Sequence, residues 1–291
     1  MTRRMFMRKT IYVALIILLV LNGILLGIIF YSKRSDLKVA FLDVGQGDAI
    51  LLTQGQNQVL IDGGKSEDKL LEGLGKHMPF WDRKIEVVLT THPDIDHIGG
   101  LSELPQKYES GSLISTKAQS DSAVFEILKN NYAPDKISKI EGKLGTKIKF
   151  QEGELEILYP FSSLEEKTYK DTNGTSLVGK VIFGKNKFLL TGDMTEKQER
   201  EMLERGIDVA AQYLKVAHHG SKYSTSENFL KKVSPFLSVI SVGKNNRYGH
   251  PAPETLEKLN NNNVSILRTD DAGDIVFQCS QKTLSCQRED F

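Results

Sequence analysis

The stretch THPDIDHIGG, residues 91–100, places two histidines and two aspartates within six residues, directly behind the apolar run IEVVLT at residues 85–90. A short apolar run that ends on polar residues is typical of a buried β-strand, so these polar side chains are expected in the loop that follows it. Histidine and carboxylate side chains are common ligands of divalent metal ions. The stretch alone leaves open whether Asp94 is a metal ligand, a base or a turn residue after Pro93.

Potential ligands also follow three other strand-like runs. Asp193 comes after FLLTG, His218 and His219 come after YLKVA, and His250 comes after VISVGKNNRYG. Loops at one edge of a sheet form the rigid concave mouth that a hydrolytic site needs. The four clusters together favour a metal site, whereas the isolated His77 is assigned no role.

The region from residue 37 to residue 291 is interpreted as one α/β domain on a short stalk at residues 32–36. Apolar β-like runs dominate it, and no linker rich in Gly, Pro or Ser divides it. Helices are expected at SEDKLLEGLGKHM, TEKQEREMLERG, STSENFLKKV and APETLEKLNN, with Ser224 and Glu227 as a possible capping box. The polar residues 162–174 have no apolar period and are expected to form a mobile insertion.

The N-terminal segment predicts a membrane anchor. The run IYVALIILLVLNGILLGIIFY, residues 11–31, carries no charge, and about 20 apolar residues span a bilayer as a helix. No small-residue cleavage site follows the run, which favours an uncleaved signal anchor over a signal peptide. Four basic residues lie within residues 3–9 and two at residues 33–34, so residues 1–10 are expected in the cytoplasm of a single-pass protein of the cell membrane. The rest of the chain would then lie outside.

The charge balance and the cysteines are less informative. Lys and Arg number 38 against 37 Asp and Glu, so net charge does not indicate a nucleic-acid binder. Cys279 and Cys286 flank the polar SQKTLS. An extracytoplasmic location would permit a disulfide between them, and two free thiols fit the sequence equally well.

These motifs resemble the metallo-β-lactamase superfamily. The usual second motif of that family is H-x-H-x-D-H, and here it reads His92-x-Asp94-x-Asp96-His97, with one histidine replaced. With FLDVGQGDAILL, IDGG, DHIGG, LLTGD, LKVAHHGS and LRTDDAGDI, this variant is similar to the metallo-β-lactamase-like domain of the ComEC family of DNA-uptake competence proteins. A single anchor stands where that family has a multi-helix channel.

The resemblance implies an α/β fold, a four-layer αββα sandwich preceded by one transmembrane helix, with a dinuclear metal site at the edge of its two sheets. The implied ligands are His92, Asp94, Asp96, His97, Asp193 and His218. The first two would bind one ion, the next two the other, Asp193 would bridge both and His218 would complete the second site. No histidine occurs in the third-motif region DTNGTSLVG, where Asn173 and Ser176 stand instead.

The replacement of a histidine by Asp94 indicates which ions would bind. An additional hard oxygen ligand shifts the preference toward Mn²⁺ or Mg²⁺ and leaves Zn²⁺ possible, so the expected cofactors are two divalent ions, Mn²⁺ or Zn²⁺, with Mg²⁺ as an option. Two such ions hold a phosphodiester and lower the pKa of water. The candidate catalytic residues are Asp96, His219 and His250, the histidines stabilising charge or protonating a leaving oxygen.

Substrate contacts are expected from the same loops. The candidate substrate-binding residues are Ser221, Lys222, Arg247 and Tyr248, and Ser221 fits plain helix capping equally well. Lys215, Lys244 and Tyr223 also lie on these loops and favour a polyanion. The glycine-rich DVGQGD and DGG are interpreted as turns, with Asp62 as a possible partner of a ligand histidine and with Asp43 and Asp48 as turn or strand-end residues.

Three functions are compatible with these features. The first is a membrane-anchored extracytoplasmic phosphodiesterase or nuclease acting on DNA, most plausibly single-stranded DNA, with the DNA-uptake machinery as the implied protein partner. The second is a metallo-hydrolase of small esters, lactones or phosphoesters. The third is a metal-binding module without turnover. Basic and aromatic side chains around the metal site would separate the first from the second, and metal content would separate the third.

Overall fold

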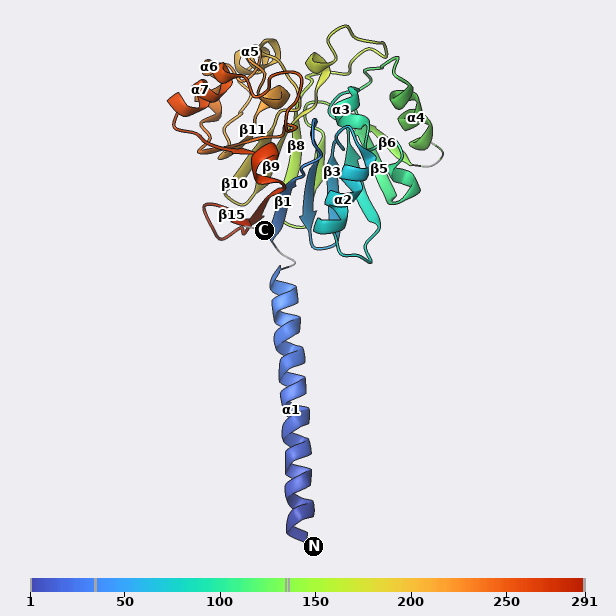
Figure 1. Ribbon diagram of the computed structural model, residues 1–291, viewed down its shortest axis with the longest axis vertical. Coiled ribbons are helices and arrows are strands. Elements are labelled where there is room, and N and C mark those ends of the chain that lie inside the picture. The colour runs from blue at the N-terminus through green and yellow to red at the C-terminus, as the bar shows by residue number, and fades with distance from the viewer. Residues whose placement is uncertain (1, 34–35, 134, 136, 290–291) are drawn as a thin grey trace.

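The computed structural model describes residues 2–33, 36–133, 135 and 137–289, and within the first helix the side chains of residue 9 and residues 11–27. In these residues the strands form two sheets (Figure 1). The first sheet runs β15-β14-β1-β2-β3-β4-β5-β6 and the second runs β13-β12-β11-β10-β9-β8-β7. The expected α/β arrangement of two packed sheets with helices is therefore confirmed.

The strand bounds of the first sheet are β1 (Leu37–Phe41), β2 (Ile50–Gln54), β3 (Asn57–Ile61), β4 (Lys84–Leu89), β5 (Glu109–Ser115), β6 (Ser138–Glu141), β14 (Ile275–Cys279) and β15 (Gln287–Glu289). Those of the second are β7 (Lys147–Lys149), β8 (Glu154–Tyr159), β9 (Val178–Phe183), β10 (Asn186–Leu190), β11 (Tyr213–Lys215), β12 (Leu237–Ile240) and β13 (Ser265–Arg268). Every strand-like run of the sequence became a strand. The polar edge strands β6, β7 and β15 carry no apolar pattern, so the sequence did not indicate them.

The core of the sandwich lies between the sheets. Aromatic side chains meet there, with the ring of Phe188 stacked on that of Tyr213 at a centroid distance of 4.2 Å and Phe277 packed beside both. The strands alternate between this core and an outer one, since Val39 and Phe41 face inward while Ala40 packs under the helices. Burial on both faces explains why the strands are nearly continuous apolar runs.

Helices cover the outer face of each sheet, which gives four layers. On the first sheet lie α2 (Glu67–His77), α3 (Ile95–Ile98) and α4 (Ala123–Asn131), whose apolar side chains join those of β1 to β5. On the second lie α5 (Glu196–Glu204), α6 (Glu227–Val233) and α7 (Pro253–Asn261). The short α8 (Thr269–Ala272) follows β13. Figure 1 shows the two helical layers on opposite sides of the sheets.

Helix starts were predicted unevenly. α5 begins behind Thr195, whose side chain and that of Gln198 form a capping box, as its sequence indicates. The capping box proposed for Ser224 and Glu227 is wrong, because Ser226 caps α6 by accepting a hydrogen bond from the N–H of Phe229 at 3.3 Å. Ser224 instead donates its hydroxyl to the carbonyl of Ala217 at 2.9 Å.

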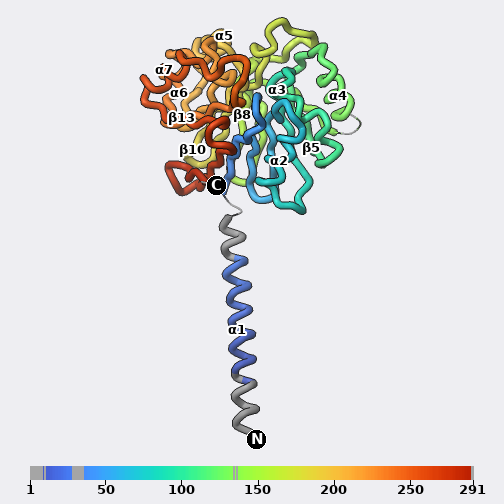
Figure 2. The backbone as a smooth tube through the Cα atoms, in the orientation of Figure 1, coloured from blue at the N-terminus to red at the C-terminus, as the bar shows by residue number. Residues whose placement is uncertain are grey.

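The two ends of the domain lie side by side. β1 pairs antiparallel with β14, and β14 continues into the hairpin with β15 (Figure 2). This hairpin carries a disulfide between Cys279 and Cys286, so the structure selects the bridge over free thiols. Cys279 is fully buried in the core between the sheets, and Cys286 packs against that core. The bridge therefore fixes the last strand to the sandwich.

The N-terminal helix α1 (Thr2–Lys33) extends away from the two sheets (Figure 1). Large apolar side chains of this helix, from Ile11 to Leu26, are exposed by half or more of their surface. Over the part of the chain that the structure describes, no helix combines the length and apolar character needed to cross a membrane.

We expect the Cys286→Ser variant to unfold more easily than the wild type. Without the bridge, the unfolded chain has more conformational entropy. For a short loop this lowers the free energy of unfolding by about 2 kcal/mol. Urea denaturation followed by tryptophan fluorescence measures the loss. Dithiothreitol should bring the wild type to the stability of the variant and leave the variant unchanged. A wild type that is insensitive to the reductant would contradict the assignment.

Candidate metal centre

Polar loops meet where the strands of both sheets end. β3 and β4 are parallel in the first sheet, and β10, β11 and β12 are parallel in the second, so their carboxyl ends lie along one edge. The loops behind them carry the histidine and aspartate clusters of the sequence. The structure thereby gathers residues that are more than 120 positions apart, such as His92 and His219, as the strand-end pattern predicts.

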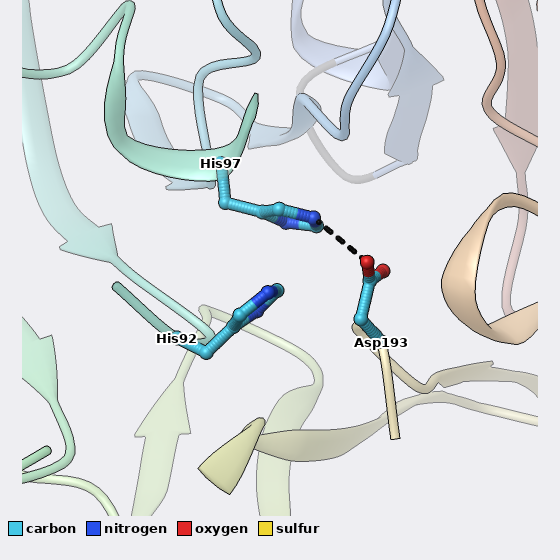
Figure 3. Close-up of side chains that lie close together, drawn as sticks. All are labelled: His92, His97 and Asp193. Atoms are coloured by element: carbon cyan, nitrogen blue, oxygen red, sulfur yellow. Dashed lines mark ion pairs between the residues drawn. The ribbon is translucent and has the colours of Figure 1, made fainter. Parts of the chain in front are cut away.

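His92 and His97 point toward Asp193 from the first turn behind β4 (Figure 3). One ring nitrogen of each is already engaged. Nδ1 of His97 lies 2.8 Å from Oδ2 of Asp62, and Nδ1 of His92 lies 3.0 Å from the hydroxyl of Thr91. The Nε2 atoms of both rings are buried and have no hydrogen-bond partner among the described residues. A histidine that is hydrogen-bonded through one ring nitrogen and directs the other, without a hydrogen bond, toward a carboxylate is the arrangement found in metal ligands.

Asp62 is the residue that holds this turn. Its carboxylate accepts hydrogen bonds from the backbone N–H of Thr91 at 2.8 Å and from the Thr91 hydroxyl at 2.6 Å, besides facing His97. Asp62 is fully buried and its φ of 57° is unusual for a residue with a side chain. The expected contact between Asp62 and a candidate ligand histidine is therefore present.

Asp193 lies at the middle of the cluster. Its Oδ2 is 3.3 Å from Nε2 of His97 and 3.3 Å from Nε2 of His219. The same nitrogen of His219 is 3.4 Å from Oδ2 of Asp96. Nδ1 of His219 donates to the carbonyl of Ser241 at 2.9 Å, which leaves Nε2 without a hydrogen bond from the described residues. Two ring nitrogens and two carboxylates thus converge.

The two neighbouring histidines behind β11 differ sharply. Both adopt left-handed backbone conformations, with φ of 49° and 52°, and this turn directs His219 inward. His219 is 1% exposed, whereas the side chain of His218 is 28% exposed and its Nε2 stands 3.9 Å from Asp193. The resemblance implied His218 as the ligand and His219 as a catalytic group, and the geometry favours the opposite order. Adjacent identical residues gave the sequence no means of choosing.

Asp94 and Asp96 form the open side of the cluster. Oδ2 of Asp94 lies 3.6 Å from Nε2 of His92, and the side chain of Asp94 is partly exposed. Burial acts to raise the pKa of Asp94, but hydrogen bonding to His92 holds it below the usual value. Burial likewise opposes the effect of His219 and His97, which keep the pKa of Asp96 low. Both carboxylates are therefore ionised at neutral pH and available as oxygen ligands.

Asp48 belongs to the cluster although it was interpreted as a turn or strand-end residue. Its Oδ2 lies 2.5 Å from Nζ of Lys215 and its Oδ1 lies 3.4 Å from Nδ1 of His219. Gly47 permits this approach, since a Cβ there would stand 1.8 Å from the carbonyl oxygen of Asp96. The glycines of DVGQGD were the available signal. Asp43 is a turn residue, accepting from the N–H of Gly45 at 3.2 Å.

Lys215 is buried rather than directed at a substrate, contrary to its expected part in polyanion binding. Its side chain has no exposed surface. Burial lowers the pKa of a lysine, yet the carboxylates of Asp48 and Asp193 raise that of Lys215 above its usual value. Burial also opposes the effect of these carboxylates and of Asp96 on His219, whose pKa is well above its ordinary value. The carboxylates of the cluster thus raise the pKa of both neighbouring basic side chains.

The donor atoms fit a divalent metal. His92, His97 and Asp193 offer atoms within 4.8 Å of one another, and so do Asp96, His97 and His219. Nitrogen and carboxylate ligands together suit Zn²⁺, Mn²⁺ or Fe²⁺, and a buried unpartnered Nε2 is otherwise costly. The histidines must lose a proton to bind an ion, so metal affinity rises with pH.

A cleft of about 580 Å³ opens beside Asp94 and Asp96. Lys65, Arg247 and Tyr248 also line it. A second cleft of about 440 Å³, lined by Lys69 and Lys244, shares Gln46 and Asn246 with the first. The first cleft therefore carries two basic side chains beside Asp94 and Asp96. The second adjoins it and carries its two lysines together with Asp43 and Asp270.

The expected substrate residues divide into two pairs. Arg247 and Tyr248 line the cleft, and the ring of Tyr248 is stacked 6.0 Å from that of His250. Ser221 is buried, and its carbonyl accepts from the hydroxyl of Thr255 at 3.0 Å. Lys222 is exposed and lines neither cleft. Ser221 therefore shapes the turn before α6, whereas the helix capping that the sequence left open for it falls to Ser226.

A family model for the metallo-beta-lactamase superfamily matches residues 42–244. ComE operon protein 3 of Bacillus subtilis is 30% identical over 267 residues, covering 86% of this chain and 34% of its own. Recombination protein 2 of Haemophilus influenzae is 30% identical, with 86% and 30% covered, and competence protein ComA of Neisseria gonorrhoeae is 25% identical, with 88% and 34% covered. The chain spans about a third of the length of these curated relatives.

Two solved structures share the fold. The metallo-beta-lactamase fold protein YhfI of Bacillus subtilis superposes with a TM-score of 0.56 at 12% identity, covering 84% of this chain and all of that one. CmlA, a diiron beta-hydroxylase of Streptomyces venezuelae, gives 0.51 at 11% identity, with 80% and 52% covered. At these identities the likeness shows the fold alone.

We predict that His219→Ala loses far more metal affinity than His218→Ala. His219 offers a buried free nitrogen beside Asp96 and Asp193, whereas His218 stands at the rim. Loss of a direct ligand should exceed the roughly 10–100-fold effect known for residues that only orient a ligand. Isothermal titration with Zn²⁺ and Mn²⁺ measures both variants. Equal losses, or a larger loss for His218→Ala, would restore His218 as the ligand.

Proposed function

This chain belongs to the metallo-beta-lactamase superfamily, and we propose that it is a metal-dependent phosphodiesterase that cleaves DNA. One observation carries the proposal: an anionic cluster, whose histidine Nε2 atoms make no hydrogen bond within the described residues, lies beside a cleft lined by Lys65, Arg247 and Tyr248. Relatives named for competence and for recombination agree with a nucleic-acid substrate.

We propose that divalent ions are held in two adjoining positions. His92, Asp94 and Asp193 would hold the outer one, and Asp96, His97 and His219 would hold the inner one, with Asp193 reaching both. Divalent ions at these positions would supply Lewis acidity toward a phosphodiester and a lowered pKa for water. The mixed oxygen and nitrogen set makes Mn²⁺ and Zn²⁺ the best candidates, with Mg²⁺ as a weaker one.

The remaining side chains would bind and orient the substrate. Arg247 would hold a phosphate with its guanidinium, and Tyr248 would offer a ring on which a base can stack, as in single-strand binding grooves. His250 has a buried Nδ1 without a hydrogen bond from the described residues. Burial lowers the pKa of His250, which keeps its ring neutral near pH 7 and able to donate a hydrogen bond to the leaving oxygen.

The assay that tests this proposal uses the full chain in detergent. We expect cleavage of single-stranded DNA with Mn²⁺ or Zn²⁺, and a loss of at least about 100-fold in Asp193→Ala, which removes the central carboxylate. Arg247→Ala should reduce the salt dependence of DNA binding by about one unit of log–log slope, while the exposed Lys222→Ala serves as the matched control. Hydrolysis of ester or lactone substrates without any DNA or RNA cleavage would favour the small-molecule alternative. Metal binding without turnover would favour a binding module.

We further propose that the N-terminal segment anchors the enzyme in the cell membrane, with residues 1–10 in the cytoplasm and residues 37–291 outside. The uncharged run extends from residue 11 to residue 31 in the sequence, close to the length that spans a bilayer. The described apolar side chains of α1 are exposed, as they would be in contact with lipid. A place beside DNA-uptake machinery follows from the relatives and belongs to the same proposal.

Membrane fractionation tests the anchor. The full chain should sediment with membranes and resist extraction with sodium carbonate, whereas a chain lacking residues 11–31 should be released, because the apolar run supplies the attachment. Protease added outside spheroplasts should digest the domain and leave cytoplasmic marker proteins intact. A full chain that is extracted by carbonate, or a domain protected from the protease, would rule out this topology.

A further inference from the structure

A third group of potential ligand atoms lies behind the two proposed metal positions. Asp48, Asp193 and His219 bring buried atoms within 4.8 Å of one another, and none of the three lines either cleft. All three residues are at most 2% exposed. By its donor atoms alone this group could hold a further cation, and what occupies it decides how many ions the centre can take.

The ammonium of Lys215 lies against this group. Nζ is 2.5 Å from Oδ2 of Asp48 and 3.7 Å from Oδ1 of Asp193, and it donates to the carbonyl of Gly192 at 3.1 Å. The backbone is fixed as well, because Thr191 donates its hydroxyl to the carbonyl of Lys215 at 2.7 Å. A lysine is almost never fully buried unless its charge is paired. Here the pairing carboxylates belong to the metal centre itself.

The position of Lys215 also gives the two carboxylate oxygens of Asp193 different neighbours. Oδ1 faces the ammonium, and Oδ2 faces the Nε2 atoms of His97 and His219 at 3.3 Å each. A carboxylate free on one side could rotate or bind an ion through both oxygens. Oδ1 is buried and makes no hydrogen bond within the described residues, so the ammonium at 3.7 Å is the cation that it faces, and Oδ2 is the oxygen directed toward the proposed ions.

We infer that Lys215 is a resident cation that fills the place of a further metal ion between Asp48 and Asp193, and that it holds Asp193 with one oxygen toward the proposed ions. It is a positioning residue, because it acts through Asp193 and has no surface in the cleft. The inference rests on the proposed metal centre. It adds that divalent ions are confined to the cleft side of Asp193.

The first experiment compares metal content in three variants of the full chain. Lys215→Met removes the charge and keeps the length, so it should bind about one more divalent ion per chain than the wild type, since the buried carboxylates then need another cation. Lys215→Arg keeps the charge and should keep wild-type content. The matched control is Lys180→Met, which removes a lysine of β9 that is 3% exposed and pairs with Asp208 at 3.0 Å. Its metal content should equal that of the wild type.

A second readout separates this role from a purely structural one. Lys215→Met should have a lower melting temperature than the wild type in EDTA, and Mn²⁺ or Zn²⁺ should restore most of the difference. Lys180→Met should lose stability that neither ion restores. The inference is overturned when Lys215→Met binds no additional ion and its stability loss is as insensitive to metal as that of the control.

A further pair of variants decides the matter when Lys215→Met does not fold. Asp48→Asn leaves the ammonium with only Asp193 as its carboxylate partner, so it should compete with divalent ions and raise their Kd by about tenfold or more. The double variant Asp48→Asn with Lys215→Met should regain most of that affinity. An unchanged Kd in Asp48→Asn, or a double variant that stays weak, would contradict a resident cation. A wild type that binds no metal would instead refute the proposed metal centre.

Discussion

Three carboxylates buried at the ends of the strands must be matched by positive charge, and this requirement governs the arrangement of the site. Asp48, Asp62 and Asp193 are each at most 2% exposed. A buried charge is strongly destabilising unless it is paired and hydrogen-bonded. Lys215 meets one part of the demand, and His97 and His219 meet another through their contacts with Asp62 and Asp193. The Nε2 atoms of His92, His97 and His219 make no hydrogen bond within the described residues.

The backbone accepts unusual conformations to bring these groups together. Asp62, His218 and His219 all have positive φ without being glycine, and such residues persist only where the surrounding structure determines them. At Asp62 the hydrogen bonds from Thr91 provide that determination, and at His219 the bond to the carbonyl of Ser241 does so. The strain therefore lies in the loops, while the regular sheets behind them supply the rigid support.

The sequence was sufficient to predict the strands and the loops that carry the cluster. It was insufficient to predict which side chains of those loops point into the cluster. Apolar runs located every strand of the two inner sheets except the short polar ones, and the residues behind them correctly marked the edge that holds the cluster. The interpretation of Asp48 as a turn or strand-end residue did not include its place in the cluster. A glycine-flanked aspartate is typical of a turn, and only the distant strand β11 brings Lys215 to it. Nothing in a pair of adjacent histidines states which one a left-handed turn directs inward.

Ser176 lies in the third-motif region, where this sequence has no histidine. The Ser176 hydroxyl lies 3.3 Å from Nδ1 of His92 and accepts a hydrogen bond from the backbone N–H of Asp193 at 3.1 Å. In this region, which lacks a histidine, Ser176 orients two candidate ligands. Asp94, the aspartate of the second motif, is more exposed and lies 3.6 Å from Nε2 of His92. Asp94 lines the cleft beside Lys65 and Arg247. The aspartate in the second motif therefore adds a negative charge at the open side of the cluster, where it favours bound cations.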